Sequence, residues 1–442
     1  ITIGEKILLN RGVRHVVPEN NEYQSVLANA ILTDPLSSPY IEEDGEKNWG
    51  PTLFSNYRNP VSLAELGLLT ISPGALYANN HGWDTETQNR LIGNIFAEVE
   101  LIKGLKLKSS LGFKFNYISN YDFLPEYFIE GSDLIEQSKL IKQLEETRYW
   151  NWENTATYSK EIGSHSFTAL IGMSAEEFKG EYLNALNAAG PGLENEIPEL
   201  RYFSYYSDDL SDRIEGNGEE NSMISYLGRI NYNYDNKFLL TFSVRRDGSS
   251  RFGSAYEKNA FNKGRWGTFP MIAGAWKISN HSFFSNVPVV SSLKLRLGWG
   301  QTGNQNIGAY RYVTSVDPSF LRYTFNLAQD SISAGAFPFY SANETIHWEV
   351  VEQINIGLDA GLFNNRLLLS AEYFDKRTKE MLVQIPVPYI AGIPSAGAPY
   401  QNIGKVQNKG VELVIGYREM ESQLKYNIDF NISYLRNEVI DM

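Results

Sequence analysis

The segment LKLKSSLGFKFNY, residues 105–117, alternates apolar and polar side chains with a period of two. Leucine, phenylalanine and tyrosine occupy six of the seven odd positions, while the even positions hold lysine, serine, glycine and asparagine. Successive side chains of an extended strand point to opposite faces of its sheet. The segment therefore predicts a strand with one apolar face and one polar face.

The same alternation recurs along the rest of the chain. It is clear in Ile224–Tyr234, Phe238–Val244, Leu293–Trp299, Ile354–Leu362, Leu367–Tyr373, Val411–Tyr417 and Lys425–Arg436, and weaker in Leu91–Leu101, Trp150–Tyr158, Phe167–Phe178 and Trp266–Ile278. These segments give about twelve strands, each roughly long enough to cross a bilayer when tilted. Ile1–Leu9 has the pattern of the end of a thirteenth.

The links between these strands alternate between brief and extended. The brief links are Ile102–Gly104, Ser159–His165, Asp235–Asn236, Ser279–Ser291, Phe363–Asn365 and Glu419–Gln423, and the extended links are Ile118–Tyr149, Lys179–Asn221, Asp247–Arg265, Gly303–His347 and Lys379–Gln407. Outer-membrane barrels have short turns on one side of the membrane and long loops on the other. A soluble two-sheet sandwich has no reason to sort its loops in this way, so we predict an all-β chain forming part of a transmembrane antiparallel β-barrel.

Composition agrees with that class and excludes others. Aromatic residues make up 13% of the chain, yet 21% of residues are charged and no apolar run approaches the length of about 18 residues that a spanning helix needs. The net charge of −13 argues against nucleic-acid binding, which requires lysine and arginine to neutralise phosphates. The absence of cysteine rules out disulfides and thiolate metal sites.

Local signals predict two tight turns and two helices. Asp235-Asn236 and Asn364-Asn365 are typical of hairpin turns, because both residue types tolerate a positive φ. Apolar residues at helical spacing predict a helix at Ser132–Thr147, and Glu22–Leu32 predicts a shorter one. Five glycines near strand ends are expected to supply backbone angles that other residues avoid: Gly248, Gly253, Gly300, Gly303 and Gly308.

Catalytic chemistry has no visible basis in the sequence. The five histidines lack the spacing of a metal-binding helix, and no phosphate-binding glycine loop or nucleophile motif occurs. We therefore predict a protein that is not an enzyme and holds neither a metal nor a cofactor.

A series of motifs between residues 226 and 413 resembles one known family. In order, they are GRINY (228–232), YDNKFLL (234–240), RRDGSSRFG (245–253), RWGTFP (265–270), SLKLR (292–296), GQTGNQNIG (300–308) with Tyr310, Trp348-Glu349, NIGLD (355–359), NIG (402–404) and NKGVEL (408–413). Each motif is weak alone, but the ordered series resembles the SusC/RagA-type TonB-dependent outer-membrane transporters of Bacteroidota. Arginines and a lysine in these motifs are expected to face the lumen or rim and to pair with acids such as Glu352, Asp359 and Glu412: Arg245, Arg246, Arg251, Lys294 and Arg296.

The resemblance implies an architecture larger than this chain. Members of the family that this chain resembles have a 22-stranded barrel filled by an N-terminal plug. A small domain and a TonB-contacting segment precede the plug. We expect residues 1–442 to be part of one barrel domain, with a long extracellular segment at 10–89 and strand hairpins at 90–436. The plug, the N-terminal domain and the terminal strands are expected to lie elsewhere in a longer polypeptide, because an open barrel would leave unpaired strand edges in lipid.

The resemblance also implies a function. It implies import of an oligosaccharide or peptide across the outer membrane, with a SusD-like surface lipoprotein over the barrel mouth and the TonB–ExbB–ExbD complex as energy source. The alternative is a scaffold subunit of an outer-membrane complex that keeps this shape but transports nothing, and a passive porin is a third reading. Upstream sequence separates them, because a transporter needs a TonB-contacting segment and a movable plug.

Four aromatic residues are the candidate ligand contacts: Tyr202, Phe203, Tyr205 and Tyr206. Aromatic faces stack on sugar rings and on peptide side chains. The alternative is that this cluster packs against a neighbouring loop or against the lipoprotein.

Overall fold

The computed structural model describes most of the chain. The described residues are 1–15, 85–124, 139–188, 213–259, 262–284, 287–317, 341–388 and 397–441, together with short pieces between these ranges. Within them, no helix is long and apolar enough to cross a bilayer.

A single antiparallel sheet of thirteen strands dominates the described residues. In spatial order its strands are β1 (Thr2–His15), β4 (Thr85–Ile102), β5 (Leu105–Leu124), β8 (Lys139–Ile162), β9 (His165–Ala188), β10 (Arg213–Tyr234), β11 (Phe238–Ser249), β12 (Trp266–Lys277), β13 (Val290–Asn304), β18 (Glu349–Leu362), β19 (Leu367–Lys379), β22 (Lys405–Glu419) and β23 (Tyr426–Asp441). Chain order and spatial order coincide, so the sheet is an up-and-down meander. Its first strand is the thirteenth strand expected from Ile1–Leu9.

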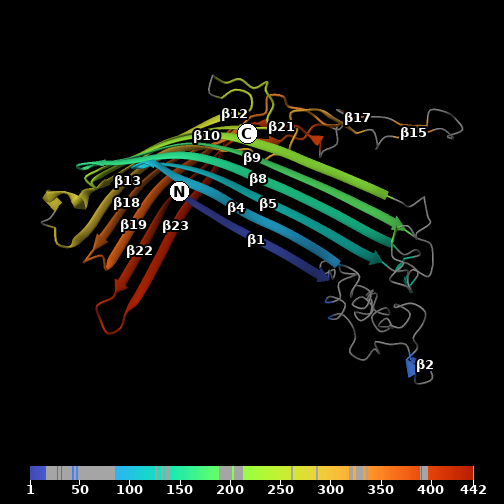
Figure 1. Cartoon of the computed structure of the whole chain (residues 1–442), viewed down its shortest axis with the longest axis horizontal. Helices are drawn as coiled ribbons and strands as arrows, with labels where there is room; N and C mark the ends of the chain where they lie inside the picture. The colour runs from blue at the N-terminus through green and yellow to red at the C-terminus, as the bar shows by residue number, and fades with distance from the viewer. Residues whose placement is uncertain are drawn as a thin grey trace.

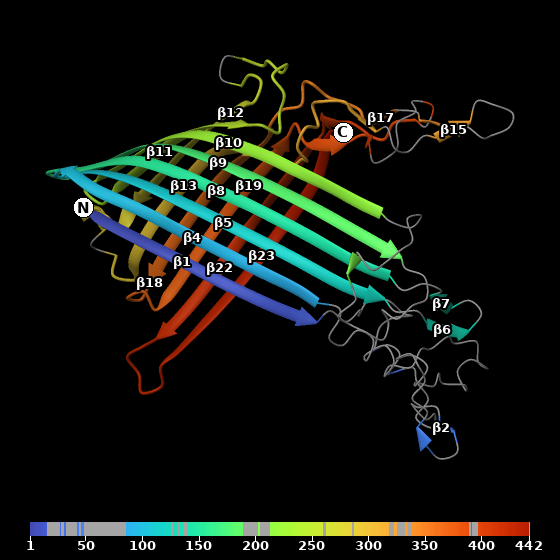
Figure 2. The ribbon, with the colours of Figure 1, turned by 45° about the vertical axis from the view of Figure 1, so that its right-hand side comes forward.

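The sheet bends into a trough. In Figure 1, β1 to β10 form one wall and β13 to β23 the other, and Figure 2 shows the second wall behind the first. The short links lie towards the left-hand side of Figure 1, because every second connection of a meander is at the same end of the strands. The described part of the chain thus has the shape of an incomplete barrel, as the alternation of link lengths predicted.

Short strand pairs lie within the long links. They are β2 (Glu42–Glu43) with β3 (Glu46–Lys47), β6 (Tyr127–Glu130) with β7 (Asp133–Ile135), β14 (Ser315–Asp317) with β17 (Phe337–Tyr340), β15 (Arg322–Thr324) with β16 (Ile332–Ala334), and β20 (Leu382–Gln384) with β21 (Tyr400–Asn402). Two single-turn 3₁₀ helices, η4 (Ile278–Asn280) and η5 (Ser282–Phe284), lie in the link between β12 and β13.

The two faces of the sheet differ in polarity. Along β18, Ile354, Ile356 and Leu358 are exposed on the outer face, while Asn355 and Asp359, at the alternate positions, make hydrogen bonds on the inner face. A soluble protein buries such an apolar face in a core. Here it covers the convex side of the trough, where a barrel meets lipid.

Both predicted turns are confirmed. Asp235 and Asn236 have φ values of 50° and 52°, the left-handed pair that a two-residue hairpin requires. Asn364 and Asn365 have φ values of 57° and 60°, and Phe363 before them also has a positive φ of 53°.

The helix predicted at Ser132–Thr147 is wrong. Residues 133–135 form β7, and β8 begins at Lys139 and pairs with both β5 and β9. Pairing on both sides satisfies the backbone of this segment, and Leu140 is fully buried against Phe123 of β5. Tertiary pairing thus overrides a locally helical pattern. The predicted helix at Glu22–Leu32 lies outside the described residues except for Leu27 and Ile31.

Several long links are shorter than the sequence indicated. The strands continue into them, so that β5 extends to Leu124, β9 to Ala188 and β1 to His15. At the other end of the segment expected at 10–89, β4 already begins at Thr85. Because β8 and β9 have 24 residues each, this wall rises well past the height of a bilayer.

The five glycines expected to supply unusual backbone angles have another role. None has a positive φ, whereas Gly104, Gly163, Gly264 and Gly404 do. A Cβ at Gly248 would lie 2.9 Å from the ring of Trp266, and one at Gly303 would overlap the ring of Phe269. These two glycines therefore provide space for aromatic rings of strand β12.

Candidate functional site

The inner face of the second wall carries an ion-pair network that joins three strands. The Nε and Nη2 atoms of Arg296 on β13 lie 2.8 and 3.0 Å from the two carboxylate oxygens of Asp359 on β18. Its Nη1 atom lies 2.9 Å from Oε2 of Glu372 on β19, and the Ser370 hydroxyl donates to Asp359 at 2.8 Å. Arg296 was expected to pair with an acid such as Asp359 and does so, whereas Glu352, another of the expected acids, pairs with Lys379. Glu372 was missed, although it follows the same alternation on the next strand.

A second network lies nearer the loop end, on β10 and β11. Arg245 donates from Nε to both carboxylate oxygens of Asp247, at 2.7 and 3.0 Å, and from Nη2 to the Ser225 hydroxyl at 2.8 Å. Ser225 is 2% exposed. Charged side chains on the inner face are thus held by partners on the same wall, which gives the lumen a fixed polar lining.

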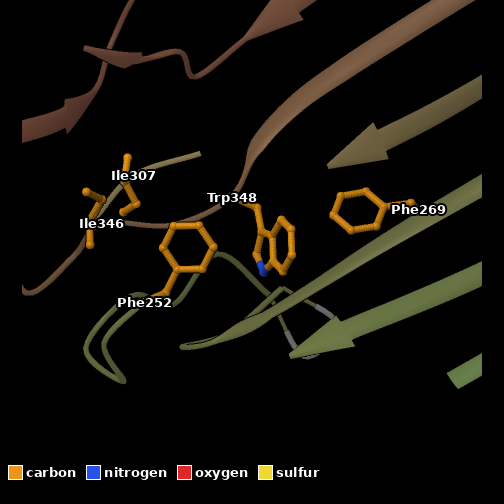
Figure 3. Close-up of a cluster of buried hydrophobic side chains, with 5 residues drawn as sticks. All are labelled: Phe252, Phe269, Ile307, Ile346 and Trp348. Atoms are coloured by element: carbon orange, nitrogen blue, oxygen red, sulfur yellow. The ribbon is translucent and has the colours of Figure 1, made fainter. Parts of the chain in front are cut away.

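A compact apolar cluster closes the loop end of the inner face. Figure 3 shows its five residues, Phe252, Phe269, Ile307, Ile346 and Trp348, gathered from the two loops and from β12. The Trp348 ring meets the Phe269 ring edge to face at 5.5 Å and the Phe252 ring at 5.1 Å. Its indole nitrogen donates to the Arg265 carbonyl at 3.0 Å. The cluster therefore fixes the β11–β12 and β13–β18 loops against the wall.

Polar contacts link the same loops to the β19–β22 loop. Lys258 donates to Glu380 at 2.8 Å, and the ring of His347 stacks on the ring of Tyr256 at 3.6 Å while its Nε2 lies 3.5 Å from the same carboxylate. The Asn402 amide donates to the carbonyls of His347 and Glu380. The nearby His347 ring and the Lys258 ammonium lower the pKa of the Glu380 carboxyl to about 2.

The predicted ligand contacts are only partly described. Tyr202 is 63% exposed, whereas Phe203 packs against the buried pair Phe123 and Leu140. Tyr205 and Tyr206 lie outside the described residues. The alternative for this cluster was packing against a neighbouring loop or the lipoprotein. Phe203 instead packs on residues of β5 and β8. Ligand contact by the other members stays a prediction.

Aromatic residues gather on the outer face at the turn end. The Phe238 and Trp276 rings stack at 6.1 Å, and the Trp276 nitrogen lies 2.9 Å from His281. On the neighbouring strands, His165 lies 2.9 Å from the Tyr232 hydroxyl. Rings with one polar group favour the boundary between lipid and water. Sequence reasoning missed this girdle, although an aromatic residue lies in or near every short link except Ile102–Gly104.

The inner face of the described residues is lined by paired polar side chains. Among them, no three histidine, aspartate or glutamate side chains are close enough together to hold a metal ion. What the inner face offers is paired charges and amides on a rigid sheet, beneath loops fixed by a small core.

Comparison with known proteins identifies the family. The family described as "TonB dependent receptor-like, beta-barrel" matches residues 25–441. The chain belongs to it. The receptor is 30% identical over 418 residues to the TonB-dependent receptor P39 of Formosa agariphila, and 28% identical over 373 residues to the TonB-dependent receptor SusC of Bacteroides thetaiotaomicron. These alignments cover 94% and 80% of the chain.

A solved structure matches as well. The structure described as "Structure of the RagAB peptide transporter" aligns with 84% of the receptor chain at a TM-score of 0.72 and 26% identity, covering 39% of that chain. The receptor chain spans about a third of the length of its curated relatives, 35% and 33% for the two named. It is therefore the wall of an outer-membrane β-barrel of the SusC-like class, and the predicted fold and location are confirmed.

Proposed function

We propose that the receptor imports an oligosaccharide or peptide nutrient across the outer membrane, and that this chain supplies barrel wall and outer loops. The observation that carries the proposal is the two-faced wall of a TonB-dependent receptor barrel: lipid-facing apolar residues outside, and fixed ion pairs such as Arg296 with Asp359 inside. The relation to SusC and to the RagAB peptide transporter supports transport of a large polar cargo.

The proposal includes two partners. A SusD-like surface lipoprotein covers the mouth, where the loops joined through Glu380 and Trp348 provide a firm rim. The TonB–ExbB–ExbD complex supplies energy from the periplasmic side, because the membrane in which the barrel lies has no ATP supply of its own.

Uptake by intact cells tests the proposal. Cells expressing the full-length receptor with its neighbouring lipoprotein are given fluorescent oligosaccharides and, separately, fluorescent peptides. We expect uptake of one class that depends on both the receptor and TonB. Uptake that persists without TonB supports a passive porin instead. No receptor-dependent uptake of either class, together with co-purification of the receptor in a larger outer-membrane complex, supports the scaffold alternative.

Ligand contact by three of the four candidate residues, Tyr202, Tyr205 and Tyr206, is part of the same proposal. Because Tyr202 is exposed while Phe203 is packed, we propose that the three tyrosines face the cargo and that Phe203 anchors their loop. A triple Ala variant at Tyr202, Tyr205 and Tyr206 is expected to weaken cargo binding by roughly tenfold, as the loss of stacked rings does elsewhere. Unchanged affinity in the variant discards the contact.

A further inference from the structure

One arginine of the wall faces lipid instead of the lumen. In the β10–β11 register, Arg246 lies opposite Tyr226, and alternation places both on the same outer face as Phe242 and Ile230. The sequence placed Arg246 with the lumen or rim residues, and the strand register corrects this. A cation on the lipid-facing surface is costly unless an anion compensates it.

Aromatic rings hold this arginine in place. The Arg246 guanidinium lies 5.3 Å from the centre of the Trp266 ring, which stacks with the Tyr226 ring at 6.1 Å. The Trp266 ring in turn lies over Gly248, where there is no side chain to displace it. Stacking orients a guanidinium and leaves its N–H groups free to bind an anion.

The anion does not come from the described part of the wall. Among the described residues, no carboxylate forms an ion pair with Arg246, although the outer-face cations Arg148 and Arg377 pair with Glu146 and Asp375. Arg246 is eight residues from the turn end of β11, about 26 Å along the strand and about 20 Å in depth at the usual tilt. The apolar band of an outer-membrane barrel is about 25 Å tall, so Arg246 lies in the loop-side part of that band, and its long side chain reaches up to the headgroups.

A groove on the same outer face extends to Tyr226, the residue opposite Arg246 on the neighbouring strand. It has a volume of about 890 Å³, and its lining includes Ala156, Ile171, Met173 and Tyr226. Ile171 is 69% exposed, so the groove opens towards lipid. An apolar groove that leads to an unpaired, oriented guanidinium fits a molecule with an acyl chain and a phosphate.

We propose that this surface binds one phosphorylated lipid, with its phosphate on Arg246 between Trp266 and Tyr226 and an acyl chain in the groove. Arginine binds phosphate through two parallel hydrogen bonds, which a neutral headgroup cannot replace. The leaflet on the loop side of an outer membrane consists of lipid A-bearing glycolipid, so lipid A is the occupant to which the site is assigned. The bound lipid would act as a fixed part of the outer wall.

Native mass spectrometry of the full-length receptor tests this proposal. Receptor in detergent is incubated with lipid A, with dephosphorylated lipid A and with phosphatidylethanolamine. We expect one retained lipid A, little dephosphorylated lipid A, and roughly tenfold less retention after Arg246→Gln. Arg246→Lys should give an intermediate value, because it keeps the charge and loses the paired hydrogen bonds.

Two further variants separate the site from general effects. Ala156→Phe fills the groove without touching the charge and is expected to reduce retention also. Arg148→Gln removes an outer-face arginine that already has a carboxylate partner, and it should leave retention unchanged. Equal retention by the Arg246→Gln variant and the wild type, an equal loss in the Arg148→Gln control, or retention of phosphatidylethanolamine in place of lipid A overturns the assignment. Heat-modifiable migration on gels confirms that each variant is folded.

Discussion

At the residue scale, packing in the wall depends on glycines as well as on large side chains, because a glycine can leave space for a neighbouring ring. Gly303 and Gly298 lie on the same strand, β13, and neither has a positive φ. The space at Gly303 is filled by the Phe269 ring, which belongs to the apolar cluster at the mouth, whereas nothing lies within 4 Å of the Cβ position of Gly298. The two glycines share a backbone conformation and differ in packing.

This difference gives a paired prediction. Gly303→Ala should destabilise the receptor by about 1–3 kcal/mol, because the new methyl group displaces the Phe269 ring from its cluster. Gly298→Ala should be neutral or slightly stabilising, since the methyl group enters open space. Denaturant midpoints of both variants in the same detergent measure the effect. Equal midpoints would show that the Phe269 cluster does not depend on this space.

The Glu380 carboxylate gives a prediction on pH. Its pKa is about 2 in the folded protein and near 4.5 in the unfolded chain. Its contribution to the stability of the loops is therefore complete above about pH 5 and is lost as the pH falls towards 2. After allowance for solvent screening we expect about 1 kcal/mol. Protease cleavage of the outer loops should be faster for Glu380→Gln than for wild type at pH 7, and the difference between the two rates should shrink below pH 4.5 and vanish only near pH 2. A constant difference across this range would contradict the assignment.

At the element scale, the extension of β8 above the membrane is the feature that changes the outline of the molecule. Residues 139–148 pair with β5 on one side and β9 on the other, so the wall continues where a loop was expected. The contact between Leu140 and Phe123, covered by Phe203, provides the only fully buried apolar pair described in this extension. The extension is expected to depend strongly on that contact.

Leu140→Ala tests this dependence. The loss of a buried leucine costs about 2–5 kcal/mol, and here the cost is local because the strands below are held by lipid. Hydrogen exchange of amides in residues 139–148 should become faster, while amides near Trp152 keep their protection. The exposed neighbour Lys142, changed to Ala, is the control and should leave both regions unchanged. Protection of 139–148 that survives Leu140→Ala would mean that backbone pairing alone holds the extension.

At the scale of the whole molecule, the apolar outer face is the surface that contacts lipid. Ile356 is 45% exposed and Gln353, on the same strand, faces the lumen. In a water-soluble protein, arginine at an exposed position such as Ile356 would be nearly neutral. In a bilayer, arginine on the lipid face of a barrel costs about 2–4 kcal/mol near the midplane.

Ile356→Arg and Gln353→Arg therefore form a test of the whole architecture. We expect the first variant to lower the stability of the full-length receptor in lipid vesicles by about 2–4 kcal/mol, and the second to change it by less than about 1 kcal/mol. Folding yield and denaturant midpoints in vesicles measure both. The reverse order would mean that the assignment of the two faces is inverted.

The sequence by itself determined the period of two, the alternation of brief and long links, the two hairpin turns and an acidic partner for Arg296. These follow from rules that act over one strand or one turn, and from matching positions on adjacent strands. Local information was insufficient at Ser132–Thr147, where the spacing predicts a helix but the segment pairs with β5 and β9. It was also insufficient at Gly303, where an aromatic ring from another strand leaves no room for a side chain. Only the tertiary structure placed Arg246 on the lipid side and Phe203 on Phe123, because facing and packing depend on the register between strands that the chain brings together from a distance.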